Sequence, residues 1–124
     1  MNYRDLLVRF YARDRGALFS RMHPDFVCHT PGRSQIAGSH RGLQGMLDHV
    51  ARMQRLTNQS FRPHARGAFM SDGEWGTVPV HLRAERDGRV LDMAAFGVWR
   101  FHEGTVIEHW ETPVDIAKFD EFWG

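Results

Sequence analysis

The sequence predicts an α+β domain in which two or three helices precede a curved antiparallel sheet. The N-terminal half places apolar residues at the three- and four-residue intervals of amphipathic helices. The C-terminal half consists of strand-like runs separated by Asp72-Gly73, Asp87-Gly88 and Glu103-Gly104. An Asp-Gly pair between alternating runs is the strongest short-range hairpin signal in a sequence. The length of 124 residues is typical of one domain, so we expect a single domain over residues 1–124.

The first predicted element is a helical segment from Tyr3 to Met22. Gly16 is expected to interrupt it, and His23-Pro24-Asp25 to end it, because the residue before a proline is driven out of the α region. The apolar residues that set the helical spacing are Leu6, Leu7, Phe10, Tyr11, Leu18 and Met22.

A short strand and a second helix follow. Phe26–Thr30 is apolar enough for a strand, and Pro31-Gly32 closes it. Gly38–Leu56 then predicts a helix, because its apolar residues form one stripe. The stripe consists of Leu43, Met46, Leu47, Val50, Met53 and Leu56.

The remaining chain predicts the hairpin strands and a final helix. The strand-like runs are 60–70, 74–86, 89–101 and 105–111, and 113–124 has the spacing of a short amphipathic helix. Strands this long must bend, and Gly67, Gly76, Pro79 and Gly97 are the expected bend or bulge positions. Helices packed into the concave side of such a sheet leave a pocket at one end.

Composition excludes several classes of partner. Sixteen Lys and Arg against fifteen Asp and Glu give a formal charge of +1, and the arginines are scattered, so nothing favours nucleic acid or a membrane surface. Cys28 is the single cysteine, which indicates a reducing compartment. No apolar leader or membrane-spanning run is visible, and we expect a cytoplasmic protein. Eight dispersed histidines match no metal-binding pattern, so no metal site is expected.

The last predicted strand carries titratable residues on both faces. Strand alternation places Ile107, His109 and Glu111 on one side, with Glu108 and Trp110 on the other. Neither face is purely apolar. The pattern alone does not decide which face is buried.

Two segments resemble a known family. The first is His29-x-Pro31-Gly32 followed by Ala37-Gly38-x-x-Arg41-Gly42, and the second is "RFHEGTVIEHWE" at residues 100–111. Together with the order of elements, they are similar to the SnoaL-like branch of the NTF2-like superfamily. The resemblance implies an NTF2-like cone-shaped barrel, with a curved antiparallel sheet wrapped around N-terminal helices and an internal pocket. It also implies a homodimer formed through the outer sheet face.

The resemblance also points to residues. In the SnoaL-like cyclases the acidic residue after His-Trp is the acid/base group, and Glu111 occupies that position. His109 lies on the same strand face and would share the pocket. His29 is a third candidate, although a one-residue shift in register would turn His29 outward and Thr30 inward.

These residues suggest a cofactor-independent enzyme that acts on a hydrophobic carbonyl compound, with a polyketide as one candidate substrate. Glu111 would be the acid/base for ring closure, isomerisation or proton transfer, and His109 would assist, because a carboxylate in an apolar pocket is a stronger base. Arg33 and Arg41 would rim the pocket mouth. The expected apolar lining consists of Phe69, Trp75, Met93, Trp99 and Phe101.

Fold alone does not select the activity, so two other hypotheses stay open. One is a non-catalytic binding or dimeric partner module on the same fold. The other is a limonene-type epoxide hydrolase, which would need Arg83 and Glu85 in the pocket beside Glu111. A ketosteroid isomerase is disfavoured, because its functional positions align with residues that lack the chemistry: Thr30, Gly97 and Leu6.

Overall fold

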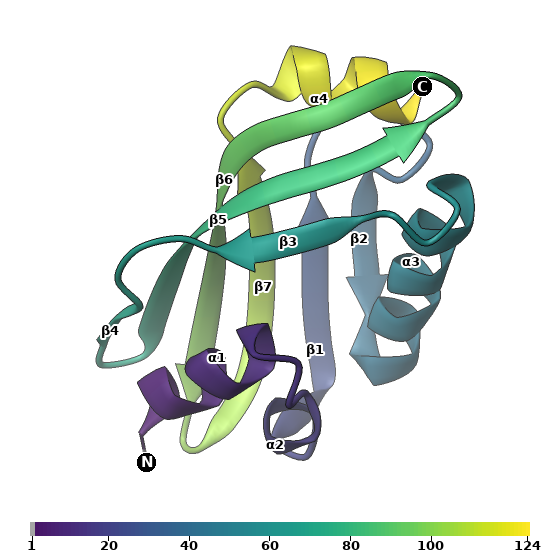
Figure 1. Ribbon diagram of the computed structural model, residues 1–124. Coiled ribbons are helices and arrows are strands. Elements are labelled where there is room, and N and C mark those ends of the chain that lie inside the picture. Colours follow the sequence, from purple (N-terminus) through teal and green to yellow (C-terminus); the bar gives the residue numbers. More distant parts are fainter. Residues whose placement is uncertain (1) are drawn as a thin grey trace.

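The computed structural model describes residues 2–124 as four helices and seven strands around one curved sheet (Figure 1). The helices are α1 (Tyr3–Tyr11), α2 (Gly16–Phe19), α3 (Gly42–Leu56) and α4 (Ile116–Trp123). The strands are β1 (Met22–Thr30), β2 (Gly38–Arg41), β3 (Arg62–Ala65), β4 (Met70–Asp72), β5 (Trp75–Arg86), β6 (Arg89–His102) and β7 (Thr105–Pro113).

The sheet has the strand order β2-β1-β7-β6-β5-β3, and β4 pairs with β5 beside β3. Strands β5, β6 and β7 form two consecutive antiparallel hairpins, as the sequence predicts. The α+β class and the curved sheet are confirmed, with two differences. The sheet is mixed, because β1 runs parallel to β7, and it stays open between the edge strands β2 and β3.

The helices surround the concave side of this sheet (Figure 1). Helices α1 and α2 lie at one end, α4 lies at the other, and α3 runs beside β1 and β2. Helix α1 begins where the Asn2 side chain accepts a hydrogen bond from the Asp5 backbone N–H at 3.0 Å, and Asp115 caps α4 in the same way. Within residues 2–124, no helix has both the length and the apolar character needed to cross a membrane.

Three segments differ from the prediction. The helical segment from Tyr3 to Met22 is two helices separated by a turn at Arg13, whose φ is 71°, and Met22 already belongs to β1. Residues 38–41 form strand β2 rather than the first turn of a helix, because they pair with the edge of β1. The run at 60–70 divides into β3 and the start of β4. In each case long-range pairing overrides the local pattern.

A bulge in β7 corrects the predicted alternation. Arg100 pairs with Glu108, whereas the next residue of β6, Phe101, pairs with Val106. Ile107 is therefore an extra residue without a partner. As a consequence Val106, which is fully buried, faces inward on one side of the bulge, and His109 faces inward on the other.

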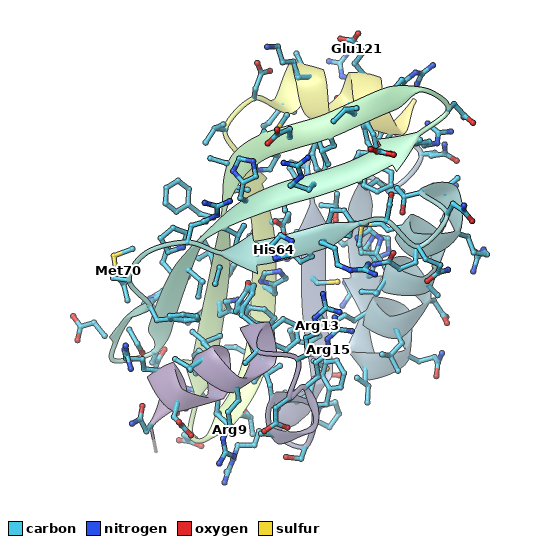
Figure 2. The ribbon with its side chains drawn as sticks, viewed as in Figure 1. Arg9, Arg13, Arg15, His64, Met70 and Glu121 are labelled. Carbon is cyan, nitrogen blue, oxygen red and sulfur yellow. The ribbon has the colours of Figure 1, made fainter. Side chains whose placement is uncertain are left out.

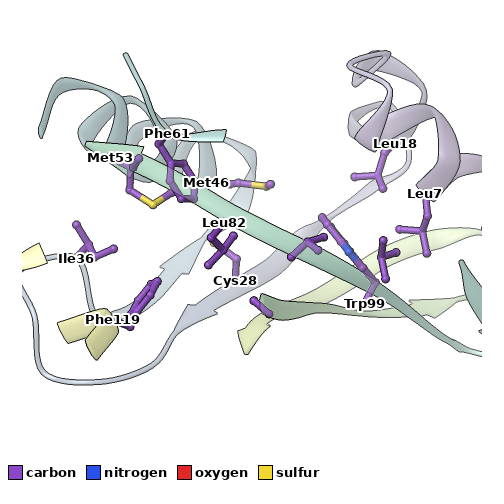
Figure 3. Packing of buried hydrophobic residues seen from close by; sticks show 14 of the residues in the cluster. Leu7, Leu18, Cys28, Ile36, Met46, Met53, Phe61, Leu82, Trp99 and Phe119 are labelled. Carbon is purple, nitrogen blue, oxygen red and sulfur yellow. The ribbon is translucent and has the colours of Figure 1, made fainter. Parts of the chain in front are cut away.

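The core lies between the sheet and the helices (Figure 3). Met46, Met53 and Phe61 gather on the α3 side, while Leu7 and Leu18 pack beside Trp99 under α1 and α2. Two predicted bend positions, Gly76 and Gly97, are where α1 approaches the sheet most closely. A Cβ at Gly76 would lie 2.5 Å from Leu7, and one at Gly97 would overlap the Tyr11 hydroxyl group. These glycines let a helix lie directly on the sheet.

Candidate active site

A cavity of about 160 Å³ opens between the concave face of the sheet and helices α1, α2 and α3. A closed core cavity of about this volume binds benzene, and this cavity is open at one side. Its walls combine apolar and aromatic side chains with a few polar groups. The apolar walls include Phe10, Phe19, Met46, Val50, Met53, Phe61 and Phe119.

Glu111 and His109 both line this cavity. Their nearest side-chain atoms, Glu111 Oε2 and His109 Nε2, are 3.6 Å apart. The other carboxylate oxygen of Glu111, Oε1, is buried and has no hydrogen-bond partner among residues 2–124. An unpartnered buried oxygen is unfavourable for folding, and it is available to a ligand.

The ring of His109 is held in one orientation. Its Nδ1 lies 3.0 Å from the backbone carbonyl oxygen of Val98. Because a carbonyl oxygen only accepts, Nδ1 must carry a proton, and Nε2 then holds a lone pair in the neutral ring. Trp99 stacks on the ring at 3.7 Å between centroids, with 23° between the planes. Nε2 is therefore fixed toward Glu111.

Tyr11 adds a hydroxyl group to the same wall. Trp99 Nε1 donates a hydrogen bond to the Tyr11 hydroxyl oxygen at 3.1 Å, and residues 2–124 provide no acceptor for the hydroxyl proton. Burial, and secondarily the negative charge of Glu111, raises the pKa of Tyr11 above its usual range. Tyr11 thus remains a protonated donor at neutral pH. Gly97, paired with Glu111 across β6 and β7, provides the space for this hydroxyl.

Thr30 and His49 form a second polar group in the cavity. Thr30 Oγ1 and His49 Nε2 are 2.9 Å apart, and His49 Nδ1 is buried without a partner among the described residues. Burial, followed by the positive charges of His40, His109 and Arg52, lowers the pKa of His49 to about 4. The imidazole of His49 is therefore neutral under ordinary conditions.

Cys28 also lines the cavity, but its chemistry is suppressed. Burial raises the pKa of the thiol to about 11. The thiolate, which is the nucleophilic form, is therefore scarce at neutral pH. Cys28 contributes packing to the wall.

The structure resolves the choice between His29 and Thr30. The Thr30 side chain faces the cavity, whereas the His29 ring lies on the outer face, where Nε2 donates to Glu108 at 2.6 Å and Nδ1 lies 2.8 Å from Ser39 Oγ. His29 also stacks on Trp110. His29 borders the cavity through its place in β1, but both ring nitrogens are engaged elsewhere. Its predicted catalytic role lacks the required geometry.

The predicted rim and lining lie mostly outside the cavity. Arg33 and Arg41 are exposed, and Arg33 uses its backbone N–H to bind the Asp120 carboxylate. Trp75 is 48% exposed on the outer sheet face, where it stacks on Trp110. The other four pack against or within the core: Phe69, Met93, Trp99 and Phe101. The prediction placed Trp75 on the wrong face of its strand. Trp99 does contribute to the site, because it contacts both His109 and Tyr11.

Sequence reasoning missed Tyr11 and His49 as polar cavity residues, and it named Thr30 only as the alternative to His29. Tyr11 and His49 stand on the apolar stripes of α1 and α3, and a polar side chain in such a stripe is the available signal. This signal does not distinguish a polar residue that lines a cavity from one that is merely half-buried. Their grouping depends on how the helices cross the sheet.

Arg83 and Glu85, which an epoxide hydrolase would need in the cavity, lie on the solvent side of β5. Both are exposed, and Arg83 pairs with Asp92 at 3.7 Å. Asp92 also bonds His81, which lowers the pKa of the Asp92 carboxyl group. The epoxide hydrolase arrangement is therefore absent from the cavity. Within residues 2–124, no three His, Cys, Asp or Glu side chains are grouped as metal ligands.

Solved structures with the same architecture include two that match this chain over nearly its full length. One is a protein of unknown function with a cystatin-like fold from Xanthomonas campestris, at 26% identity and a TM-score of 0.88, covering 100% of this chain and 99% of that one. The other is Bal32a from a soil-derived mobile gene cassette, at 30% identity and a TM-score of 0.84, with coverage of 98% and 93%.

A third similar structure is IdmH, a candidate polyketide cyclase from Streptomyces antibioticus. It has 19% identity, a TM-score of 0.66 and coverage of 92% of this chain and 93% of its own. At this identity the likeness shows the fold alone. A comparison with curated proteins finds no match.

The family model of the SnoaL-like domain matches residues 3–109, which include helices α1, α2 and α3 and most of the sheet up to His109. The chain belongs to the SnoaL-like domain family of the NTF2-like superfamily.

Proposed function

We propose that this protein is a cofactor-independent acid/base enzyme that removes a proton beside a carbonyl group of a hydrophobic small molecule, as a cyclase or isomerase does. One observation carries the proposal. Glu111 presents a buried oxygen without a protein partner to an apolar cavity that also holds His109 and Tyr11. A base, a proton relay and a hydrogen-bond donor in one enclosure are the groups that enolisation requires.

The first step is proton abstraction by Glu111. The C–H bond next to the substrate carbonyl breaks, its proton passes to Glu111 Oε1, and the electron pair moves into the enolate. Oε1 needs no hydrogen bond to be broken first, since it has no partner among residues 2–124. The apolar side chains beside it leave few protein groups that compete with the substrate for this oxygen.

Tyr11 stabilises the negative charge that develops on the enolate oxygen. Its hydroxyl proton is free, because Trp99 donates to the oxygen and no described residue accepts the proton. The raised pKa keeps Tyr11 protonated, so that it donates rather than repels. A donor already in place loses nothing to reorganisation when the charge appears.

His109 completes the proton transfer. Its Nε2 faces Glu111 at 3.6 Å, within reach of small side-chain movements. In a ring closure the enolate carbon attacks a second carbonyl of the same molecule. A carbon–carbon bond forms, and the new alkoxide takes back the abstracted proton, either directly from Glu111 or after His109 Nε2 has accepted that proton from Glu111. In an isomerisation the proton returns to a different carbon. Neither reaction changes the oxidation state of the substrate.

The test is proton exchange of a simple ketone in D₂O. The protein is mixed with 2-tetralone, and NMR follows the loss of the proton signal next to the carbonyl. We expect exchange above the buffer rate, and a loss of about a hundredfold or more in Glu111→Gln. The matched control is Glu108→Gln on the outer face of the same strand, which should exchange at the wild-type rate.

Full exchange activity in Glu111→Gln contradicts the proposal. The alternative of a non-catalytic binding module predicts a different pattern. It requires that the wild type and Glu111→Gln bind 2-tetralone with equal affinity and that neither of them accelerates exchange.

We also propose that the outer sheet face binds a second copy of this chain. Trp75 and Phe96 expose large apolar surface there, and Val114 and Ile116 are exposed beyond the end of β7. Exposed apolar patches of this kind mark association surfaces. Light scattering on Trp75→Glu is the test: we expect a dimer to dissociate while the cavity chemistry persists. An unchanged mass would contradict this arrangement.

A further inference from the structure

The mouth of the cavity is basic. Four of the side chains that line it are Arg13 and Arg15 from the turn between α1 and α2, and Arg62 and His64 from β3. Figure 2 labels Arg13, Arg15 and His64 where the α1–α2 turn faces β3. The only acidic side chain among the lining residues is Glu111.

These basic side chains have no acidic partner within the described part of the chain. Across residues 2–124, the ion pairs include none formed by Arg13, Arg15, Arg62 or His64. Asp14 stands between two of them in the sequence, but its carboxylate lies 4.0 Å from Arg9 instead. Three guanidinium groups without a counter-charge at one opening create a local positive potential that attracts anions.

Local contacts hold two of the arginines beside the cavity. Arg62 Nη1 donates to the backbone oxygen of Phe61 at 2.7 Å, and Phe61 itself lines the cavity. The Arg15 guanidinium lies 6.0 Å from the ring centroid of Phe10, another lining residue. The left-handed backbone of Arg13, with φ at 71°, reverses the chain so that both loop arginines border the opening.

We propose that the substrate carries an anionic group, a carboxylate or a phosphate, which Arg13, Arg15 and Arg62 bind at the cavity mouth while its apolar carbonyl portion enters. This inference rests on the proposed function, because it takes the cavity as the substrate site. Guanidinium groups suit carboxylate and phosphate oxygens, since they offer paired donors in one plane. The negative charge of Glu111 disfavours the opposite orientation.

Binding of small aromatic probes tests the inference without any turnover. Calorimetry compares 2-naphthoate with its uncharged analogue 2-naphthamide, at low and at high salt. We expect 2-naphthoate to bind roughly tenfold more tightly at low salt, with the preference reduced at high salt because exposed charges are screened. 2-Naphthyl phosphate, measured in parallel, distinguishes a preference for phosphate from one for carboxylate.

Three double variants localise the effect, and the two that replace arginine with glutamine change the charge by the same amount. Arg13→Gln with Arg62→Gln should remove the preference for the anion, and Arg13→Lys with Arg62→Lys should keep part of it. The matched control is Arg33→Gln with Arg41→Gln, since both arginines are exposed and neither lines the cavity. That control should bind 2-naphthoate as the wild type does. Arg13, Arg33 and Arg41 are exposed and Arg62 is half-buried, and circular dichroism verifies that the variants fold.

The inference is overturned if 2-naphthamide binds as tightly as 2-naphthoate, if neither anion binds, or if the Arg33 and Arg41 control loses as much affinity as the mouth variant. Each of these results concerns binding alone. Failure of the proposed function would appear instead as unchanged proton exchange in Glu111→Gln, so the two failures are distinguishable.

Discussion

A glutamate lies beside a histidine on each face of strand β7, but the hydrogen bonds of the two pairs differ. On the outer face, Glu108 accepts from His29 at 2.6 Å, and the other nitrogen of that ring lies 2.8 Å from Ser39 Oγ. On the inner face, Glu111 and His109 are 3.6 Å apart, and Glu111 Oε1 has no partner among residues 2–124. One pair is satisfied within the protein and the other is not.

This difference identifies where a ligand is needed. A polar group whose hydrogen bonds are complete stabilises the fold and has nothing left to offer a substrate. A buried polar group with an unused position costs stability, and it persists where binding or chemistry uses it. Residue type alone would rate the two His–Glu pairs equally, but their hydrogen bonds separate them.

After the loss of Glu111, the loss of the Tyr11 hydroxyl should have the largest effect on the exchange rate. Tyr11→Phe should reduce 2-tetralone exchange by about a hundredfold, since removal of one donor to a developing oxyanion has effects of that order. The loss should appear in kcat rather than in KM, because the bond strengthens in the transition state. NMR exchange rates at several ketone concentrations measure both parameters.

Tyr3→Phe is the matched control for this prediction. The Tyr3 hydroxyl accepts from the Gly104 backbone N–H at 2.9 Å, and Tyr3 does not line the cavity. Tyr3→Phe removes the same atom as Tyr11→Phe, but from a hydroxyl that is hydrogen-bonded outside the cavity, so exchange should be unaffected. Equal losses in the two variants would show that a missing hydroxyl acts only through the fold.

The second prediction concerns stability against pH. The pKa of His49 is about 4 in the folded protein, against 6.5 for an unperturbed histidine. Between pH 6.5 and 4, His49 is protonated in the unfolded chain but neutral in the folded protein. The contribution of neutral His49 to the free energy of unfolding is therefore complete above pH 6.5 and is lost as the pH falls toward 4. The free energy of unfolding should fall by roughly 3 kcal/mol through this group.

Urea denaturation across this pH range, in the wild type and in His49→Gln, isolates the contribution of His49. The wild type should show the steeper dependence on pH, and the difference between the two curves should be concentrated between pH 4 and 6.5. Parallel curves would mean that the unpartnered Nδ1 takes up its proton without cost in the folded state. The inner face would then be less constrained than its hydrogen bonds indicate.

The third prediction uses Gly97 of β6, whose lack of a side chain leaves room for the Tyr11 hydroxyl. In Gly97→Ala the new Cβ overlaps the Tyr11 hydroxyl, and overpacking of this kind costs about 1–3 kcal/mol. The cost should be smaller in the presence of Tyr11→Phe, because the overlapping atom is then absent. A double-mutant cycle by thermal or urea unfolding measures the coupling. Additive costs would mean that α1 shifts as a whole to avoid the contact.

The sequence predicted the framework of the site better than its contents. Asp87-Gly88 and Glu103-Gly104 predicted the hairpins correctly, because both turns adopt the left-handed conformation that such pairs favour. Those hairpins fix the register that pairs Gly97 with Glu111, so the inward direction of Glu111 and His109 followed from local information and the family resemblance.

The other site residues depend on long-range packing. The residue types of β7 do not reveal the bulge at Ile107. Which residues of β1 face inward depends on the pairing of that strand with β2 and β7. Arg33 and Arg41 looked like rim residues because they flank a loop near the site in sequence. The arginines at the actual mouth come from the α1–α2 turn and from β3, two segments that only the folded chain brings together.

The smallest expected effect is at the outer pair. His29 and Glu108 are both about 30% exposed in their side chains, and partly exposed pairs contribute about 0.2–1 kcal/mol. A double-mutant cycle of His29→Ala and Glu108→Ala should give a coupling energy in that range by urea unfolding. The cycle cancels the stacking of His29 on Trp110, which the His29→Ala variant removes with or without Glu108. Ketone exchange should persist in all three variants. If exchange instead fell together with the outer coupling, the satisfied pair would be positioning β7 for Glu111, and the two faces would have to be treated as one functional unit.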